Sequence, residues 1–319
     1  MLFAASLLLV AAACGEVARP GAPVPSPTEP VVVNAEGVPG AAGQPLGPYT
    51  PGSDVSFELR TNAATEQLVG LLADSTFVDW DLIRESFEAA PAPVAGADPP
   101  SLSAVAGSAA TGPLGAAYVE RFGSADWLQA RALAAILGTD EFAASSDRDR
   151  AAELSNLLAI ELPLVRALVA AEAGERLTAA GDLDRRFGAP HEWDRLWVIF
   201  QGAAPLVAAL TEETLGAIQS GAAAGASGDA EAARNAHDVV RVALLRIALA
   251  EIARSEAARA NAFLAGVEPL LAQLDPGATR DLAALLGPDA APDPEAIKRL
   301  VGQLAERAGL EASFVLAAS

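Results

Sequence analysis

The residues of this chain best suited to metal chemistry lie in one stretch, 188–202. It reads GAPHEWDRLWVIFQG and holds two of the four tryptophans and one of the two histidines. Pro190 favours a helix start, because the N–H that proline lacks is one that the first helical turn leaves unpaired. On such a helix His191 and Asp194 share one face, and Glu192 lies close by. An imidazole and carboxylates are common metal ligands, so this spacing predicts a candidate metal site.

This stretch and three others resemble the low-iron-inducible periplasmic proteins, an iron-assimilation family of algae and bacteria. The pattern GAPH-x-WD-x-x-W begins at residue 188, and matching segments follow the family's order: VDWDLIRESFE at 78–88, FGSADWLQARALAAILGTDEFAASSDRDRAAE at 122–153, and residues 220–272. The resemblance covers about residues 75–290. It implies an iron site built from histidine and carboxylates on two equivalent helices.

Carried over residue by residue, the family's ligand pattern is matched in part. His191 and Asp194 match, whereas Arg195 stands where a glutamate is expected. In the second helix the expected histidine and glutamate are Glu256 and Arg259. Two interpretations stay open. Either iron binds weakly at a single site, or the arginines pair with carboxylates in a salt-bridged core, while the acids of the first turn interact with the helix dipole.

The sequence favours a binding protein, or a plain structural module, over an enzyme. His191 and Glu192 begin an HExxH zinc-protease signature, but its fifth residue is Arg195. His237 lies in an apolar helical segment and is interpreted as a core histidine. The sequence has no glycine-rich phosphate loop after a strand and no serine in a nucleophile elbow. Ligand should stabilise a binding protein, but not a scaffold.

Composition indicates an all-α fold and an acidic surface. The chain has 41 acidic and 21 basic residues, for a formal net charge of -20. This balance argues against nucleic acid or anionic membrane as a partner, since both attract Lys and Arg. Alanine and leucine carry the apolar content, which favours packed helices over sheet. We therefore predict a multi-helix bundle.

Cys14 is the only cysteine, so an intramolecular disulfide and a cysteine-based zinc site are excluded. It follows an apolar run at 7–10 and three alanines, a pattern that resembles a bacterial lipobox. We predict a signal peptide over 1–13, lipidation of Cys14, and an extracytoplasmic protein, periplasmic or on the cell surface, that contacts the membrane through this lipid alone. The alternative is an ordinary secretory signal with a chance cysteine. The sequence identifies no uptake-system partner.

Residues 14–56 are predicted to form a tether, and residues 57–319 a helical domain. Nine of the 22 prolines fall between Pro20 and Pro51. Such a segment buries too little apolar surface to offset its ordering entropy. Alternation at 55–59 suits one short strand, although the sequence offers no partner strand nearby.

Capping residues, prolines and glycines predict where the helices of the domain begin and end. Helices are expected over 64–72, 78–89, 114–122, 125–137, 206–223 and from Asp229 to about Arg254, with further starts at Asp275 and Asp293, each followed by proline. Ser145 or Ser146 caps a long helix that Pro163 kinks or breaks. Residues 90–112 are predicted to be a surface loop or a second linker, and the glycines at 221, 225 and 228 a turn. The apolar run at 239–252 predicts a buried helix.

An internal similarity suggests a duplicated helical hairpin. Residues 200–210 align with 264–274, sharing Gly, Pro and Leu positions. We place the repeats at about 150–210 and 229–274, with Pro205 and Pro269 expected at matching turns or helix starts. Chance similarity in an alanine-rich chain is the alternative.

Overall fold

The computed structural model describes residues 40–73, 78–90, 99–287, 290 and 292–312. The predicted all-α fold is confirmed: the described residues form a helical bundle without a strand, apart from an isolated bridge between Leu46 and Tyr49. The predicted signal peptide, Cys14 and the first part of the predicted tether lie outside the described residues.

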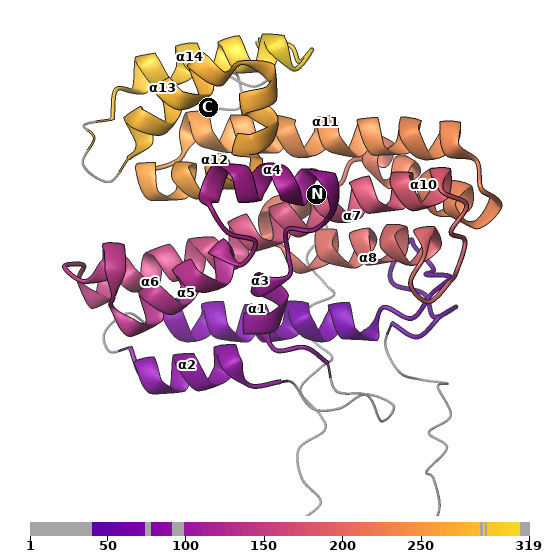
Figure 1. Ribbon diagram of the computed structural model, residues 1–319, viewed down its shortest axis with the longest axis horizontal. Coiled ribbons are helices and arrows are strands. Elements are labelled where there is room, and N and C mark those ends of the chain that lie inside the picture. The colour runs from indigo at the N-terminus through magenta and orange to yellow at the C-terminus, as the bar shows by residue number, and fades with distance from the viewer. Residues whose placement is uncertain (1–39, 74–77, 91–98, 288–289, 291, 313–319) are drawn as a thin grey trace, which may run out of the picture. The chain divides into compact units, whose positions relative to one another are not determined.

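The helices follow one another through the domain as Figure 1 shows. They are α1 (Ser56–Ala73), α2 (Trp80–Glu88), α3 (Leu102–Gly107), α4 (Gly112–Phe122), α5 (Trp127–Leu137), the 3-10 turn η1 (Asp140–Phe142), α6 (Asp147–Asn156), the π turn η2 (Leu157–Glu161), α7 (Leu162–Ala179), α8 (Ala189–Gly202), α9 (Ala204–Val207), α10 (Glu212–Ser227), α11 (Ala230–Arg254), α12 (Ala257–Leu274), α13 (Pro276–Leu286) and α14 (Pro294–Arg307).

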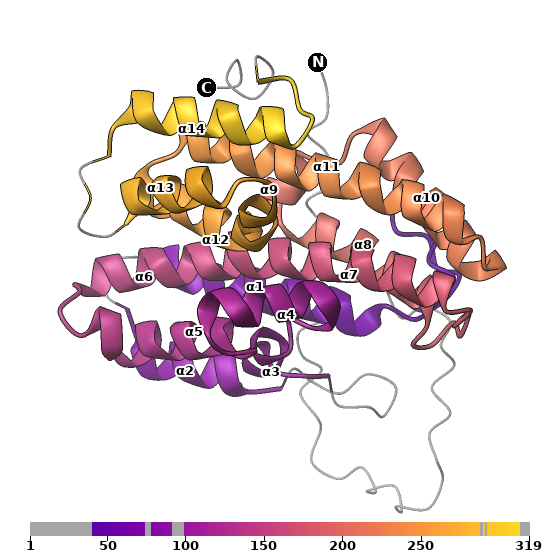
Figure 2. The ribbon, with the colours of Figure 1, turned by 45° about the horizontal axis from the view of Figure 1, so that its top comes forward.

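Helix α7 is the centre of the bundle. Every side chain from Leu162 to Ala171 is buried, as expected of a helix that is surrounded by others. It packs against α8 on one side and α11 on another, and α1 lies against α8 (Figure 1). In Figure 2, α14 lies beside α11 and α13 beside α12.

The predicted interruption at Pro163 takes the form of a π turn. The Leu162 N–H donates to the Leu157 carbonyl, five residues back. Proline cannot donate to the carbonyl of Ala159, and the wider turn accommodates the missing bond. Among the described residues, one helical run, Asp147–Ala179, is long and apolar enough to cross a membrane, but 83% of its most apolar window is buried in the bundle, as in the core helix of a globular domain.

A buried carboxylate lies at the end of this π turn. Glu161 is fully buried, and its carboxylate is 3.1 Å from the Arg131 guanidinium of α5. Burial raises the pKa of Glu161 to about 7, although Arg131 opposes the shift. Arg131 also pairs with Glu153 at 3.3 Å. This ion-pair cluster ties α5 to α6 and η2.

Several predicted helix starts are confirmed by their caps. The Asp229 and Asp275 side chains accept from the N–H groups of Ala232 and Ala278, three residues on. Ser146 caps α6, and Asp293 caps α14. These are local hydrogen bonds, and local sequence is sufficient to predict them.

Three local predictions are wrong. Residues 55–59 do not form a strand, because α1 begins at Ser56. Residues 90–112 are not entirely loop, because Ser101 caps the short helix α3. The helix expected over 206–223 is broken at 208–211, where Thr211 caps a new helix, α10. In the last two cases a serine or threonine offers a local hydrogen bond that the apolar spacing does not report.

Trp193 explains two helical glycines, Gly174 of α7 and Gly221 of α10. Its indole is fully buried, and a Cβ at Gly174 or Gly221 would come within 2.7 or 2.5 Å of it. Both positions therefore need glycine for α7 and α10 to approach α8. The expectation that Gly221 and Gly225 mark a turn is wrong, because both lie inside α10. Gly228, with a φ of 78°, ends the helix.

The folded domain begins well before residue 57. Tyr49, Ser53 and Val55 are buried, and residues 40–55 lie against the bundle. The predicted tether over 14–56 is therefore too long at its C-terminal end. Its composition misleads there because a few side chains of this segment find specific partners in α8.

The internal similarity is matched only in outline. Helices α7 and α8 form one hairpin, and α11 and α12 form another. Beyond that the prolines differ: Pro205 starts the short helix α9, whereas Pro269 lies inside α12. The expectation of matching turns is wrong. Residues 262–271 of α12 are all buried, so packing on every side keeps the helix intact through the proline.

Candidate functional site

The predicted site lies at the start of α8, where the chain turns from residues 182–188 into the helix. Pro190 occupies the first turn as expected, and Trp193 and Trp197 are fully buried on the core side. His191 and Asp194 lie instead toward residues 40–55, the segment that precedes α1. Two chain segments distant in sequence, residues 40–55 and the start of α8, thus meet here.

Asp194 is buried, and both of its carboxylate oxygens accept hydrogen bonds. The Tyr49 hydroxyl donates to Oδ1 at 2.5 Å. The N–H and the hydroxyl of Ser53 both donate to Oδ2 at 2.7 Å. The Tyr49 ring also lies 5.2 Å, centroid to centroid, from Trp197. A carboxylate with three donors is satisfied without a cation.

Tyr49 acts as a stable donor to this carboxylate. Burial raises the pKa of Tyr49 above its ordinary value, and the neighbouring Asp194 charge raises it further. The phenol therefore keeps its proton throughout the physiological range. Together with Ser53, it fastens residues 40–55 to α8, and we call the three residues Tyr49, Ser53 and Asp194 the latch.

His191 contacts the latch through Ser53. Its Nδ1 lies 3.3 Å from the Ser53 hydroxyl oxygen. That hydroxyl has a single hydrogen, which it donates to Asp194, so its oxygen is left to accept from the imidazole. This assigns the ring hydrogen to Nδ1. His191 and Asp194 are brought together, as the spacing predicted, but a serine stands between them.

Glu192 belongs to a separate ion-pair cluster that joins three helices. Its carboxylate is 3.2 Å from Arg195, whose Nε is 2.9 Å from Glu58 of α1. Glu58 also contacts the guanidinium of Arg166 in α7. Burial opposes the ionisation of Glu58, but Arg166 and Arg195 together hold its pKa below the ordinary value. Arg195, which stands at the family's expected glutamate, thus neutralises carboxylates.

The second helix of the predicted repeat shows a similar pairing. Arg259 lies 3.5 Å from Glu251 and over the ring of Phe263, and Glu256 is exposed at the start of α12. His237 lies apart, with Nδ1 2.8 Å from Glu175 of α7. Burial lowers the pKa of His237, although Glu175 opposes the shift.

The arrangement fits an iron ion poorly. Among the described residues, no group of three or more His, Cys, Asp or Glu side chains is arranged to hold a metal ion. Asp194 is hydrogen-bonded within the latch, and Glu192 pairs with Arg195. A pocket of about 310 Å³ borders Asp194, but only 2% of that residue is exposed. The site is closed by the protein's own groups.

Sequence reasoning missed four partners of these residues: Tyr49, Ser53, Glu58 and Arg166. The two latch partners carry no local signal, because they are 145 and 141 residues from Asp194. Arg166 does carry one. It is the single charged residue in the apolar run LPLVRALVAA, and a buried cation needs an anion.

Comparisons with known proteins give no match: no family model matches the chain, and neither the curated proteins nor the solved structures yield a similar protein. The resemblance to the low-iron-inducible proteins remains a prediction from the residues that carry it.

Proposed function

We propose that this chain is a non-catalytic helical interaction protein, held outside the cytoplasm by a lipid on Cys14, whose ancestral iron position has become a structural cluster. The observation that carries the proposal is the pairing of the predicted ligands. Asp194 accepts three hydrogen bonds, and Glu192 and Glu58 pair with Arg195.

Electrostatics supports this function over iron assimilation. A ferrous or ferric ion needs several anionic ligands, and here two arginines lie among the carboxylates. Moving the Glu192 carboxylate from Arg195 to a metal would leave two buried arginines, Arg166 and Arg195, to share the carboxylate of Glu58, which is destabilising. The arginines also repel an incoming cation at short range. The residues therefore favour the interpretation in which Arg195 replaces the metal.

Isothermal titration with ferrous and ferric iron tests this proposal. We expect no saturable heat with the wild-type chain, with His191→Ala or with His237→Ala. The last variant is the matched control, because it removes the other histidine of the chain, which lies with Glu175 and away from α8. One-to-one binding that is lost in His191→Ala and kept in His237→Ala would establish an iron site and refute the proposal.

The lipid anchor has its own test. If Cys14 holds the protein at the membrane, a Cys14→Ala form is released into the soluble extracytoplasmic fraction. Fractionation followed by immunodetection measures this, with wild type as the control. Retention of the variant in the membrane fraction would contradict lipidation. It would not bear on iron binding at α8, which the titration tests separately.

A further inference from the structure

Four helices of the bundle, α4, α7, α11 and α12, each contribute residues to a pocket of about 170 Å³. At about 30 Å³ per water molecule, this volume has room for a small organic molecule but not for a large one. Three buried leucines, one each from α4, α7 and α12, form its apolar part: Leu114, Leu168 and Leu270. The other lining residues are mainly polar. A pocket between helices that combines an apolar part with a few polar groups has the composition of a ligand site.

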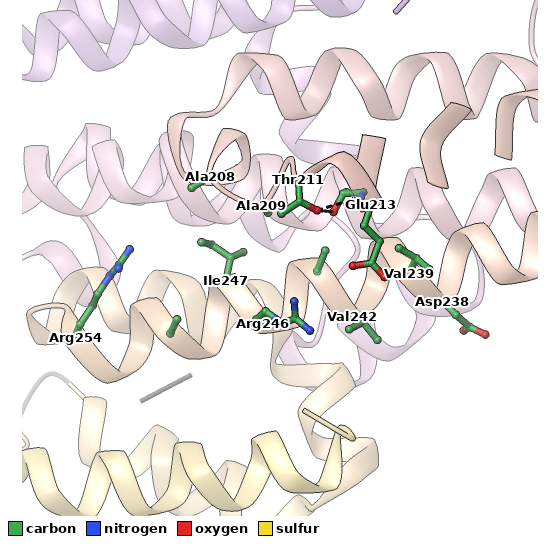
Figure 3. A pocket seen from close by; sticks show the side chains of 13 residues that line it. Ala208, Ala209, Thr211, Glu213, Asp238, Val239, Val242, Arg246, Ile247 and Arg254 are labelled. Atoms are coloured by element: carbon green, nitrogen blue, oxygen red, sulfur yellow. Dashed lines mark hydrogen bonds between the residues drawn. The ribbon is translucent and has the colours of Figure 1, made fainter. Parts of the chain in front are cut away.

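Arg241 of α11 brings an uncompensated positive charge to this pocket. It is partly buried, and within the described part of the chain its guanidinium forms no ion pair and no hydrogen bond. Asp238, three residues earlier, lines a separate groove between α11 and the turn that joins α9 to α10 (Figure 3). The planar fork of a guanidinium matches the two oxygens of a carboxylate. Arg241 is therefore available to bind a carboxylate that enters the pocket.

Two hydrogen-bond acceptors line the same pocket. The Leu114 N–H, at the start of α4, donates to both oxygens of Glu172 at 3.1 and 3.0 Å, and this carboxylate keeps lone pairs for further donors. His237 is the second acceptor. Burial lowers its pKa, so the ring is neutral at pH 7, and its Nδ1 hydrogen is donated to Glu175 at 2.8 Å. Since Glu175 does not line the pocket, the unprotonated Nε2 is the ring nitrogen available there.

We infer that this pocket binds a small aliphatic α-amino acid as the zwitterion. The ligand carboxylate would pair with Arg241, the ammonium would donate to Glu172 and to Nε2 of His237, and the side chain would contact the three leucines. The pocket presents one cation and one anion, so a ligand with the same two charges leaves neither of them unmatched. A plain carboxylate or a plain amine would match only one. This assignment goes beyond the proposed function and does not depend on whether α8 binds iron.

Calorimetric titration of the full-length Cys14→Ala chain with L-alanine, L-valine and L-leucine tests the inference. We expect saturable one-to-one binding of at least one of the three. Two compounds that each carry half of the charges of valine, 3-methylbutanoate and 2-methylpropylamine, should bind at least tenfold more weakly than L-valine, because each loses a hydrogen-bonded charge. The absence of saturable binding by all three amino acids, or a half-ligand that binds as tightly as L-valine, would overturn the assignment.

Variants locate the site and assign the two charges, with the tightest-binding of the three amino acids as the probe. Arg241→Gln should weaken its binding at least tenfold without weakening 2-methylpropylamine, and Glu172→Gln should do the same without weakening 3-methylbutanoate. The matched control is Arg246→Gln on the same helix, which should leave affinity unchanged, because Arg246 lines the separate groove (Figure 3). Glu172 also caps α4, so if Glu172→Gln fails to fold, Gln273→Trp at the exposed rim of the pocket replaces it and should weaken binding at least tenfold. Wild-type affinity in a folded Arg241→Gln chain would refute the site.

Discussion

Replacing Arg166 with methionine is expected to lower the free energy of unfolding by about 3 kcal/mol. Arg166 is 3% exposed in the centre of α7, and it contacts the buried carboxylate of Glu58. Methionine fills most of the aliphatic volume but leaves Glu58 with Arg195 as its ion-pair partner among the described residues. The loss arises because the buried carboxylate of Glu58 keeps only one of its two arginine partners.

The pH dependence separates this cause from a packing defect. The native-state pKa of Glu58 is lowered, so its contribution to stability is present above the unfolded-state pKa and is lost as pH falls through the native value. In Arg166→Met that lowering is reduced. The deficit relative to wild type should therefore be largest at pH 7 and should shrink toward pH 4, as measured by urea unfolding at each pH.

Two further variants make the test specific. Arg176→Met changes an exposed arginine of the same helix and should alter stability by less than about 0.5 kcal/mol. The double variant Arg166→Met/Glu58→Leu replaces this ion pair with an apolar pair and leaves Arg195 paired with Glu192, so it should recover part of the loss. An equal loss in Arg176→Met, or a deficit that is independent of pH, would contradict the role given to this cluster.

The parts of the fold that sequence predicted are those with local causes. Asp229, Asp275 and Asp293 each cap a helix through an N–H two or three residues away, and Pro163 disturbs its own turn. Spacing within α8 was sufficient to bring His191 and Asp194 to one side of the helix. Such features depend on a few neighbouring residues, so a single sequence contains them in full.

The parts that sequence did not predict depend on distant residues. Gly221 has the local appearance of a turn residue, but it is helical because Trp193 from α8 occupies the space beside it. Residues 40–55 have the composition of a tether, but Tyr49 and Ser53 bind Asp194. Val239, Val242 and Ile247 of α11 are only partly buried, because the helix expected over 206–223 breaks after α9. In each case the deciding partner lies in another element, and its position follows only from the fold.

The predicted ligands illustrate the difference between residue type and environment. His191, Glu192 and Asp194 have the chemistry for a metal, and the fold places two of them around Ser53. Whether one of these carboxylates can bind a metal depends on its neighbours, and those neighbours belong to α1, α7 and the segment before α1. Within the stretch itself the local signal was Arg195, since a cation among candidate ligands favours ion pairing over metal binding.

The most direct test is a double-mutant cycle on the latch, because the central claim is that the Asp194 carboxylate is committed to protein donors. Tyr49→Phe removes one donor, Asp194→Asn removes the charge, and urea unfolding gives the coupling between them. We expect about 1.5–3 kcal/mol, the range for a hydrogen bond to a charged group. The control pairs Asp194→Asn with Tyr118→Phe, which removes the hydroxyl that donates to Gly266. That pair should be additive within about 0.5 kcal/mol. Additivity of the Tyr49 and Asp194 variants as well would contradict the latch and leave the carboxylate free to serve a ligand.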